Sequence, residues 1–138
     1  MTASAELTIP NTMEGISLAA ARWLEFAAGR GLSDEARDDL ALCLEEALTN
    51  VHKYGYQGDA LQEIWVQMTV NDGSAVIEIA DQGVPFDPTA AAPPDLNAPI
   101  ENRPIGGLGI HLMRSLTDEF SYRRLDGRNV VRLRKLLI

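Results

Sequence analysis

The sequence predicts an α/β protein, a two-layer α/β sandwich in which a mixed, mostly antiparallel sheet is covered on one face by helices. Two observations carry this prediction. Three segments repeat their apolar residues at the period of an amphipathic helix, and five shorter runs have the composition and turn boundaries of strands. The chain has 138 residues, 46% of them hydrophobic, so it can bury a core without disulfides or metal staples. We therefore expect residues 1–138 to form a single domain.

The first strand and the first helix are expected within the first 31 residues. A β-prone run over Glu6–Ile9 is followed by proline, which suits an edge strand because proline cannot donate a hydrogen bond to a sheet. Asn11 or Thr12 can cap the helix that follows, and the glycines in residues 29–31 end it. Trp23 lies on the apolar face of this helix, so we expect it in the core.

The second helix is expected to begin after Ser33, a good capping residue. Asp34 and Glu35 fall in its first turn, where the helix dipole favours negative charge. We expect this helix to run to about Tyr54. Cys43 has apolar neighbours on it, which indicates a buried structural thiol in place of a nucleophile or metal ligand.

The remaining elements alternate between strands and one more helix. The turn signals Asn71-Asp72-Gly73 and Asp126-Gly127 each indicate a connection between two neighbouring strands. The expected elements are strands over Glu63–Val70 and Ala75–Ala80, a helix over Gly107–Leu116, and strands over Phe120–Leu125 and Asn129–Leu137.

Charge and hydropathy exclude several classes of function. The formal net charge of -8 disfavours direct binding to nucleic acid. No apolar run is long enough for a membrane span and the N-terminus lacks a secretion signal, so we expect a cytoplasmic protein with no membrane partner. Half of the twelve basic residues crowd into the C-terminal segment, which indicates either a solvated outer face of the sheet or a docking patch for an acidic partner.

Three polar motifs stand out against this framework. Glu46 and Asn50, one helical turn apart, project together from the flank of an apolar stripe. Asp81 follows an alternating run in phase with residues that face the helices, where an ionised carboxylate is costly unless it is hydrogen-bonded. Taken alone, Asp81 would start a turn with Gly83. The third motif, residues 106–110, has three glycines and opens a helix.

In order and spacing, these motifs resemble the N, G1 and G2 boxes of the GHKL (histidine-kinase-like) ATPase superfamily. The first box reads Glu-Ala-Leu-Thr-Asn over Glu46–Asn50, which is similar to the Glu-Ala-x-Thr-Asn of the bacterial anti-sigma-factor serine kinases. The resemblance implies the Bergerat ATPase fold, with ATP and Mg²⁺ held between the helices and an ATP lid over about residues 88–105.

The resemblance also implies a role for each motif residue. Glu46 would be the general base for a serine hydroxyl, and Asn50 would ligate Mg²⁺. Asp81 would accept a hydrogen bond from the adenine amino group. The other expected nucleotide contacts are Gly83 and Phe86 at the base, Arg103 in the lid, and Gly106, Gly107, Leu108 and Gly109 at the phosphates. His52 and Lys53 receive no catalytic role.

The function implied is that of a serine protein kinase that phosphorylates a STAS-type anti-anti-sigma protein and sequesters a sigma factor or similar regulator. Such proteins commonly dimerise, and an outward Trp65 suggests a homodimer through the exposed sheet face. One alternative is a non-catalytic, ATP-gated binding module, and another is the ATP-binding fragment of a two-component histidine kinase. Asn129 departs from the family pattern. Many relatives carry a Gly-x-Thr near the start of the last strand, in which the threonine helps hold the base through water, whereas this chain has Gly127-Arg128-Asn129, and the asparagine can still hydrogen-bond.

Overall fold

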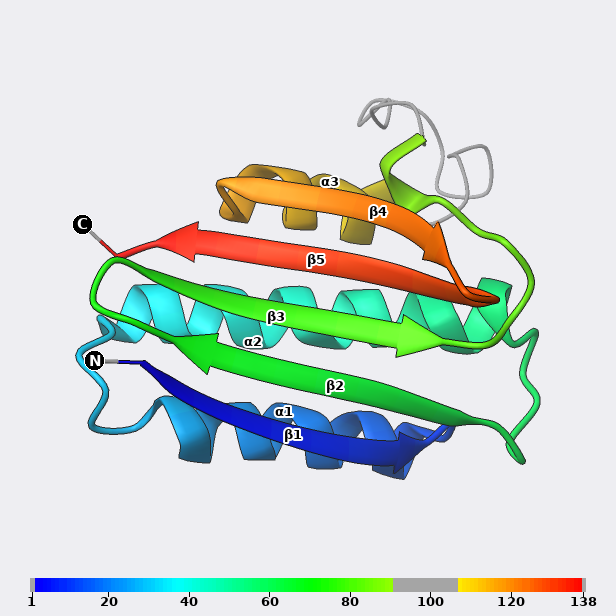
Figure 1. Cartoon of the computed structure of the whole chain (residues 1–138), viewed down its shortest axis with the longest axis horizontal. Coiled ribbons are helices and arrows are strands. Elements are labelled where there is room, and N and C mark those ends of the chain that lie inside the picture. The colour runs from blue at the N-terminus through cyan, green and yellow to red at the C-terminus, as the bar shows by residue number, and fades with distance from the viewer. Residues whose placement is uncertain (1, 91–106, 138) are drawn as a thin grey trace.

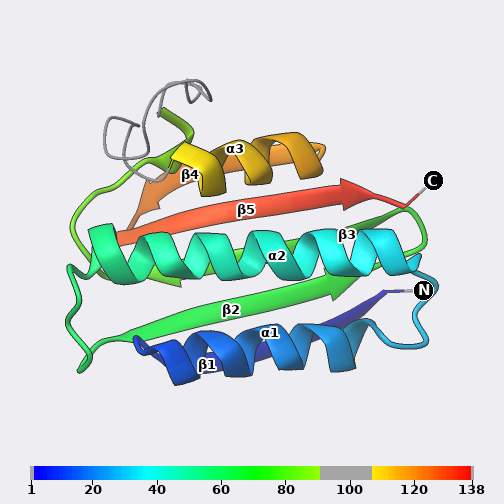
Figure 2. The same cartoon turned by 180° about the vertical axis from the view of Figure 1, so that it is seen from behind.

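One five-stranded sheet with three α-helices packed on a single face forms the protein (Figures 1 and 2). The computed structural model describes residues 2–90 and 107–137. The strands are β1 (Ala3–Pro10), β2 (Glu63–Val70), β3 (Ser74–Asp81), β4 (Glu119–Leu125) and β5 (Arg128–Leu136), in the spatial order β1-β2-β3-β5-β4. The predicted α/β class is confirmed. The expected mixed sheet differs in one respect, since every strand pairing among the described residues is antiparallel.

The two long helices begin at the predicted caps. Thr12 Oγ1 accepts a hydrogen bond from Gly15 N at the start of α1 (Met13–Ala27), and Ser33 Oγ accepts one from Ala36 N at the start of α2 (Asp34–Asn50). The third helix, α3 (Gly107–Leu116), has the bounds that its apolar period predicts. In Figure 2 the central helix α2 crosses the middle of the sheet, with α1 on one side and α3 on the other.

The end of α2 differs from the expectation of a regular helix to about Tyr54. After Asn50 the chain continues as a π-helical turn, η1 (Val51–Gly55), in which Tyr56 N donates to Val51 O at 2.8 Å. Such wide turns place one extra residue in the helix and turn the following side chains to new directions. The amphipathic pattern alone cannot distinguish this turn from an α-helical one.

Two hairpins make up most of the sheet. β2 and β3 are joined around Asn71, whose Oδ1 accepts from Gly73 N and Ser74 N at 2.9 and 2.8 Å. β4 and β5 are joined by Asp126 and Gly127, both with positive φ. The hairpins meet where β3 pairs with β5, and this pairing places Asp81 opposite Asn129.

The core lies between the sheet and the helices. Trp23 is fully buried, as predicted, and its indole N–H donates to Arg37 O at 2.9 Å. Cys43 is also fully buried, and burial raises the pKa of its thiol to about 12, so it remains protonated at neutral pH. Both residues therefore serve packing.

The other face of the sheet carries no helix among the described residues and is the face turned toward the viewer in Figure 1. Within the described residues, no helix is both long enough and apolar enough to cross a bilayer.

Candidate active site

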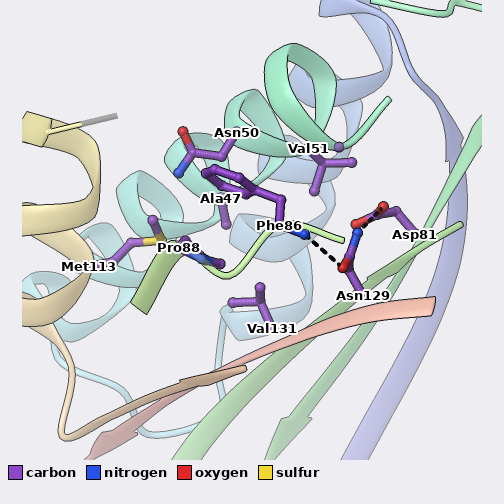
Figure 3. Close-up of a pocket in the computed structure, with 10 residues that line it drawn as sticks. Ala47, Asn50, Val51, Asp81, Phe86, Pro88, Met113, Asn129 and Val131 are labelled. Carbon is purple, nitrogen blue, oxygen red and sulfur yellow. Dashed lines mark hydrogen bonds between the residues drawn. The ribbon is translucent and has the colours of Figure 1, made fainter. Parts of the chain in front are cut away.

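The three motifs come together at one end of the sheet. A pocket opens there between α2, α3 and the ends of β3 and β5 (Figure 3). Its lining residues are Ala47, Asn50, Val51, Gly55, Asp81, Phe86, Pro88, Met113, Asn129 and Val131. The hollow that remains between these side chains is about 10 Å³, room for about one water molecule. A purine base is far larger, so it can enter only if side chains at the pocket move.

Glu46 lies on the flank of α2 and reaches the first turn of α3. A Cβ atom on Gly109 would stand 2.2 Å from Glu46 Oε2, so the carboxylate is packed directly against the backbone at this glycine. Glycine is therefore required at position 109 while Glu46 keeps this position. The start of a helix presents free N–H groups that bind anions, so a carboxylate and an anion-binding helix end face each other here.

Asn50 follows Glu46 by one turn and is 6% exposed. Its Nδ2 atom is buried and has no hydrogen-bond partner among the residues that the structure describes. Buried amides are nearly always paired, because an unpaired one costs about 1–3 kcal/mol. In Figure 3 the amide lies beside the Phe86 ring at the pocket. An unpaired amide in this place indicates a site that is completed by a ligand.

Asp81 ends β3 and is 2% exposed. Its Oδ1 atom accepts from Gly83 N at 2.8 Å and from Asn129 Nδ2 at 3.0 Å. Burial raises the pKa of Asp81, while these two hydrogen bonds and the positive charge of Arg124 lower it and partly offset burial. The carboxylate is therefore fixed by its neighbours and lines the pocket.

The structure shows why position 83 requires glycine, which the sequence does not reveal. A Cβ atom on it would lie 2.2 Å from Gly55 O, and Val84 N donates to the same carbonyl at 2.9 Å. The chain after β3 thus packs directly on the backbone of η1. The close contact with Gly55 is sufficient to explain why residue 83 is glycine. That Gly83 also leaves room for a purine ring stays a prediction.

Phe86 and Pro88 close the pocket from the side of the predicted lid. The Phe86 ring lines the pocket, as predicted, and packs on Tyr54 with 5.2 Å between ring centroids. Pro88 is buried in η2 (Pro88–Ala90). Arg114 Nη2 of α3 donates to Thr89 O at 2.9 Å, so this segment is attached to α3.

Other predicted residues lie outside this cluster or outside the described part of the chain. Leu108 is 47% exposed on the first turn of α3, and its contact with phosphate stays a prediction. Lys53 is exposed. Residues 91–105 of the predicted lid, with Arg103, and Gly106 lie outside the described residues. Gly107 begins α3.

His52 points away from the pocket and joins the β1–α1 corner. Its Nδ1 lies 3.0 Å from Asn11 Oδ1 and 3.2 Å from Asn11 O. Both Asn11 atoms are acceptors, because Asn11 Nδ2 donates to Asp59 O, so His52 Nδ1 carries the proton. His52 therefore joins the first turn of η1 to the β1–α1 corner and serves the fold.

The sequence assigned no site role to Tyr54 or Tyr56, and it drew attention to Asn129 only as the replacement of a threonine that helps hold the base in many relatives. Tyr56 donates to Glu63 O at 2.5 Å and accepts from Gln82 N at 2.8 Å, which holds the chain beside Asp81 in place. Asn129 contacts Asp81 across the β3–β5 pairing. The departure from threonine at position 129 is the one signal in the sequence that draws attention to it.

The comparisons with known proteins agree with this arrangement. Residues 9–135 match the family of the histidine kinase-like ATPase domain. The serine-protein kinase RsbW of Listeria monocytogenes is 30% identical over 129 residues, covering 91% of this chain and 82% of the relative. The serine/threonine-protein kinase BtrW of Bordetella bronchiseptica is 34% identical over 108 residues, covering 78% of this chain and 76% of the relative.

Two solved structures share the fold. The RsbU and RsbW domains of Rv1364c from Mycobacterium tuberculosis match with a TM-score of 0.69 at 18% identity, covering 97% of this chain. This chain spans only 32% of that protein. A chain of the SiaB–SiaC complex from Pseudomonas aeruginosa matches with a TM-score of 0.60 at 16% identity, covering 96% of this chain and 89% of that one.

The enzyme class expected from the three motifs, an ATP-dependent serine/threonine protein kinase, is confirmed by the named relatives. The resemblance on which that expectation rests is confirmed as well: the chain belongs to the histidine kinase-like ATPase domain family.

Proposed function

We propose that this protein transfers the terminal phosphoryl group of ATP to a serine of a STAS-type antagonist protein, and that it also sequesters a sigma factor or similar regulator. The observation that carries the proposal is the position of Glu46, whose carboxylate is packed against Gly109 at the first turn of α3. A carboxylate beside an anion-binding helix start suits transfer between a phosphate and a hydroxyl.

Glu46 acts as the general base in this proposal. Phosphoryl transfer needs positioning and charge neutralisation more than covalent chemistry, and the acceptor hydroxyl must lose a proton as it attacks. With the phosphates at the N-terminal turn of α3, a serine hydroxyl that approaches them is within reach of Glu46. Binding of ATP alone would not require a carboxylate there, which favours the kinase over a non-catalytic, ATP-gated module.

Asn50 is the residue that would hold Mg²⁺. Its unpaired, buried amide fits the ion, because the amide oxygen and nitrogen exchange places on rotation of the amide, and an amide oxygen is a suitable ligand for a hard cation. The ion would take its remaining ligands from phosphates and water, and it would neutralise phosphate charge. The backbone of Gly106, Gly107, Leu108 and Gly109 would contact the phosphates, and Arg103 the terminal one.

Asp81 would recognise the adenine base of ATP. Its ionised carboxylate accepts a hydrogen bond from an exocyclic amino group such as that of adenine, and Phe86 supplies an apolar wall. Because the hollow holds only about one water, Phe86 must move aside when the base enters.

The proposed partner proteins are an inference from the family resemblance, which the names of the relatives support. RsbW and BtrW are named as serine and serine/threonine protein kinases, and SiaB occurs in a complex with SiaC. We infer the STAS-type substrate and the sequestered regulator from the anti-sigma kinases that the first box resembles.

A homodimer through the bare sheet face is part of the proposal. On this face β1 and β2 carry Glu6 and Glu63, while β4 and β5 carry arginines, so a second copy related by a two-fold axis parallel to the strands would set the acidic edge against the basic one. Trp65 of β2 lies on the same face, and the guanidinium of Arg128 of β5 stacks over its ring at 4.4 Å from the ring centroid. A monomeric mass by light scattering at micromolar concentration would overturn this part.

The deciding experiment is transfer of labelled phosphate from Mg·ATP to a purified STAS-type protein encoded beside this chain in its genome. Glu46→Gln should slow transfer by about 100-fold or more, because general bases contribute 10²–10⁴-fold, while ATP affinity is kept. Glu45→Gln is the matched control, since Glu45 is the exposed neighbour on the same helix and should transfer normally.

Each outcome has a distinct meaning. Phosphoserine on the acceptor, lost with Glu46→Gln alone, supports the kinase. Normal transfer by Glu46→Gln refutes the base assignment. ATP binding without transfer to the STAS protein or to other candidate acceptors favours the binding module. A label that is lost in mild acid but survives in alkali indicates phosphohistidine and the two-component alternative.

A further inference from the structure

Asn129 is the most connected polar side chain at the pocket. It is the second residue of β5, lies opposite Asp81 of β3 and is 3% exposed. Its Nδ2 donates to Asp81 Oδ1 at 3.0 Å and to Val84 O at 2.8 Å. Its Oδ1 accepts from Phe86 N at 3.2 Å and from Tyr122 Oη at 2.6 Å. Figure 3 shows two of these bonds, to Asp81 and to Phe86.

These four bonds use the whole hydrogen-bonding capacity of one amide. A primary amide has two N–H donors and one oxygen with two lone pairs, and each of them has a partner here. The partners also fix the orientation of the amide. Turning it over would set its NH₂ group against the donor Phe86 N, and its oxygen against the Asp81 carboxylate and the Val84 carbonyl.

Other side chains at this position would break the arrangement. Threonine has one hydroxyl and offers a single donor, so it cannot serve both Asp81 and Val84. Aspartate has nearly the same shape as asparagine but would set a second carboxylate about 3 Å from the first, where the two cannot both ionise easily. The asparagine that departs from the family pattern is therefore matched to its surroundings in this chain.

The consequence for Asp81 is that one of its two oxygens is fully engaged. Oδ1 takes hydrogen bonds from Gly83 N and Asn129 Nδ2, whereas Oδ2 takes none from the described residues. The same amide holds Val84 and Phe86, which lead into the predicted lid. One side chain thus joins the base-reading carboxylate to the segment that closes the pocket.

We propose that Asn129 is the positioning residue for base recognition, holding Asp81 so that Oδ2 alone is offered to an exocyclic amino group while it orders the Val84–Phe86 segment over the base. This inference rests on the proposed function, because it assumes that the ligand is ATP. Asn129 acts through Asp81 in this account and need not touch the nucleotide.

The charge state of Asp81 gives a readout specific to this role. Of the influences that lower the pKa of Asp81 against burial, the hydrogen bond from Asn129 is the largest. The titratable and charged groups nearby are Arg124 of β4, which lowers the same pKa, and Tyr56 after η1. Arg128 of β5 acts on Tyr56. Without Asn129, Asp81 should gain its proton at a higher pH.

The first measurement needs no nucleotide. Carboxyl ¹³C resonances followed by NMR between pH 3 and 8 report the protonation of Asp81 in the wild type, in Asn129→Ala and in Asn129→Asp. We expect the midpoint to move to higher pH in both variants, and further in Asn129→Asp because of the second carboxylate. An unchanged midpoint in folded variants overturns the proposal.

The second measurement is ATP affinity by calorimetry from pH 5.5 to 8. Asn129→Ala should bind ATP about tenfold more weakly at pH 7.5, since a hydrogen bond to a charged group is lost. As the pH is lowered, the affinity of this variant should begin to fall at a higher pH than the affinity of the wild type does. Asn71→Ala is the matched control, because it removes an amide that holds the β2–β3 turn at the far end of the sheet. It should keep both the affinity and the pH profile.

The outcomes separate this inference from the proposed function. If the wild type does not bind ATP, the proposed function fails whatever the NMR titration shows. If the wild type binds ATP but Asn129→Ala binds within twofold and with the same pH profile, the positioning role fails and the proposed function stands. Equal weakening by Asn71→Ala would mean that the loss is one of stability and would also overturn the role.

Discussion

Two buried asparagines, Asn11 and Asn50, both lie beside η1 and differ in whether the amide nitrogen has a hydrogen-bond partner. Asn11, at the β1–α1 corner, donates to Gln62 O and Asp59 O and accepts from His52. Asn50, at the end of α2, has a buried amide nitrogen without a partner among the described residues. A paired buried amide contributes to the stability of the fold, whereas an unpaired one costs stability, which fits the proposal that a ligand completes the site at Asn50.

The largest effect is expected from removing the unpaired amide of Asn50, which tests whether this side chain binds the metal. Asn50→Ala should weaken Mg²⁺-dependent ATP binding by about 10–100-fold, the range seen when a metal site is disturbed, with little loss of stability. Calorimetric titration with and without Mg²⁺ measures the effect. Normal Mg·ATP affinity in this variant would remove Asn50 from the metal site.

A substitution across the pocket tests whether Glu46 must stay where it is. In Gly109→Ala the new methyl group would meet Glu46 Oε2 at 2.2 Å, so the carboxylate has to shift. We expect phosphoryl transfer to fall about 100-fold, as for an ångström-scale displacement of a reacting group. Gly73→Ala is the control, since its nearest neighbour would be 3.9 Å away, and it should transfer at the wild-type rate. Equal rates for the two variants would show that Glu46 tolerates displacement.

The paired asparagine should give the opposite phenotype. Asn11→Ala removes the donor to Asp59 O and the side-chain acceptor of His52, so the free energy of unfolding should fall by about 1–3 kcal/mol. Urea unfolding measures this change, and ATP affinity at a temperature where the variant is folded should equal that of the wild type. A loss of affinity without a loss of stability would reverse the assignment of the two asparagines.

The smallest expected effect concerns the pH dependence of stability. Burial raises the pKa of Asp81 in the folded state, so the folded protein holds this proton more tightly than the unfolded chain does. The resulting stability is present at low pH and is lost as pH rises through the raised pKa. Asp81→Asn should therefore melt higher than the wild type at pH 7, with the difference vanishing below about pH 4. A lower melting temperature at pH 7 would contradict this sign.

The secondary structure was largely predictable because its signals are local. Glu63–Val70 and Gly107–Leu116 have the predicted bounds, and both long helices begin at the predicted caps. Caps, turns and apolar periods act within a few residues, so the sequence displays them directly. The π-helical turn at Val51–Gly55 was missed because it depends on packing against Gly83 and Asn11.

The site was predictable in its parts but less so in its connections. Family resemblance placed Glu46, Asn50 and Asp81, and the structure brings them to one end of the sheet. The bond between Asp81 and Asn129 joins residues 48 positions apart, and it exists only because β3 and β5 are neighbours in the sheet. The order of the strands in the sheet cannot be predicted from local sequence patterns.

The same pairing has a consequence for the order of folding. β2–β3 and β4–β5 are local hairpins that can close early, whereas the β3–β5 junction and the docking of α2 close much longer loops. Glu46, Asp81 and Asn129 come from three separately formed pieces, so a partly folded chain has strands and helices but no site. ATP therefore binds only the completed protein, and by mass action it adds stability to that state alone.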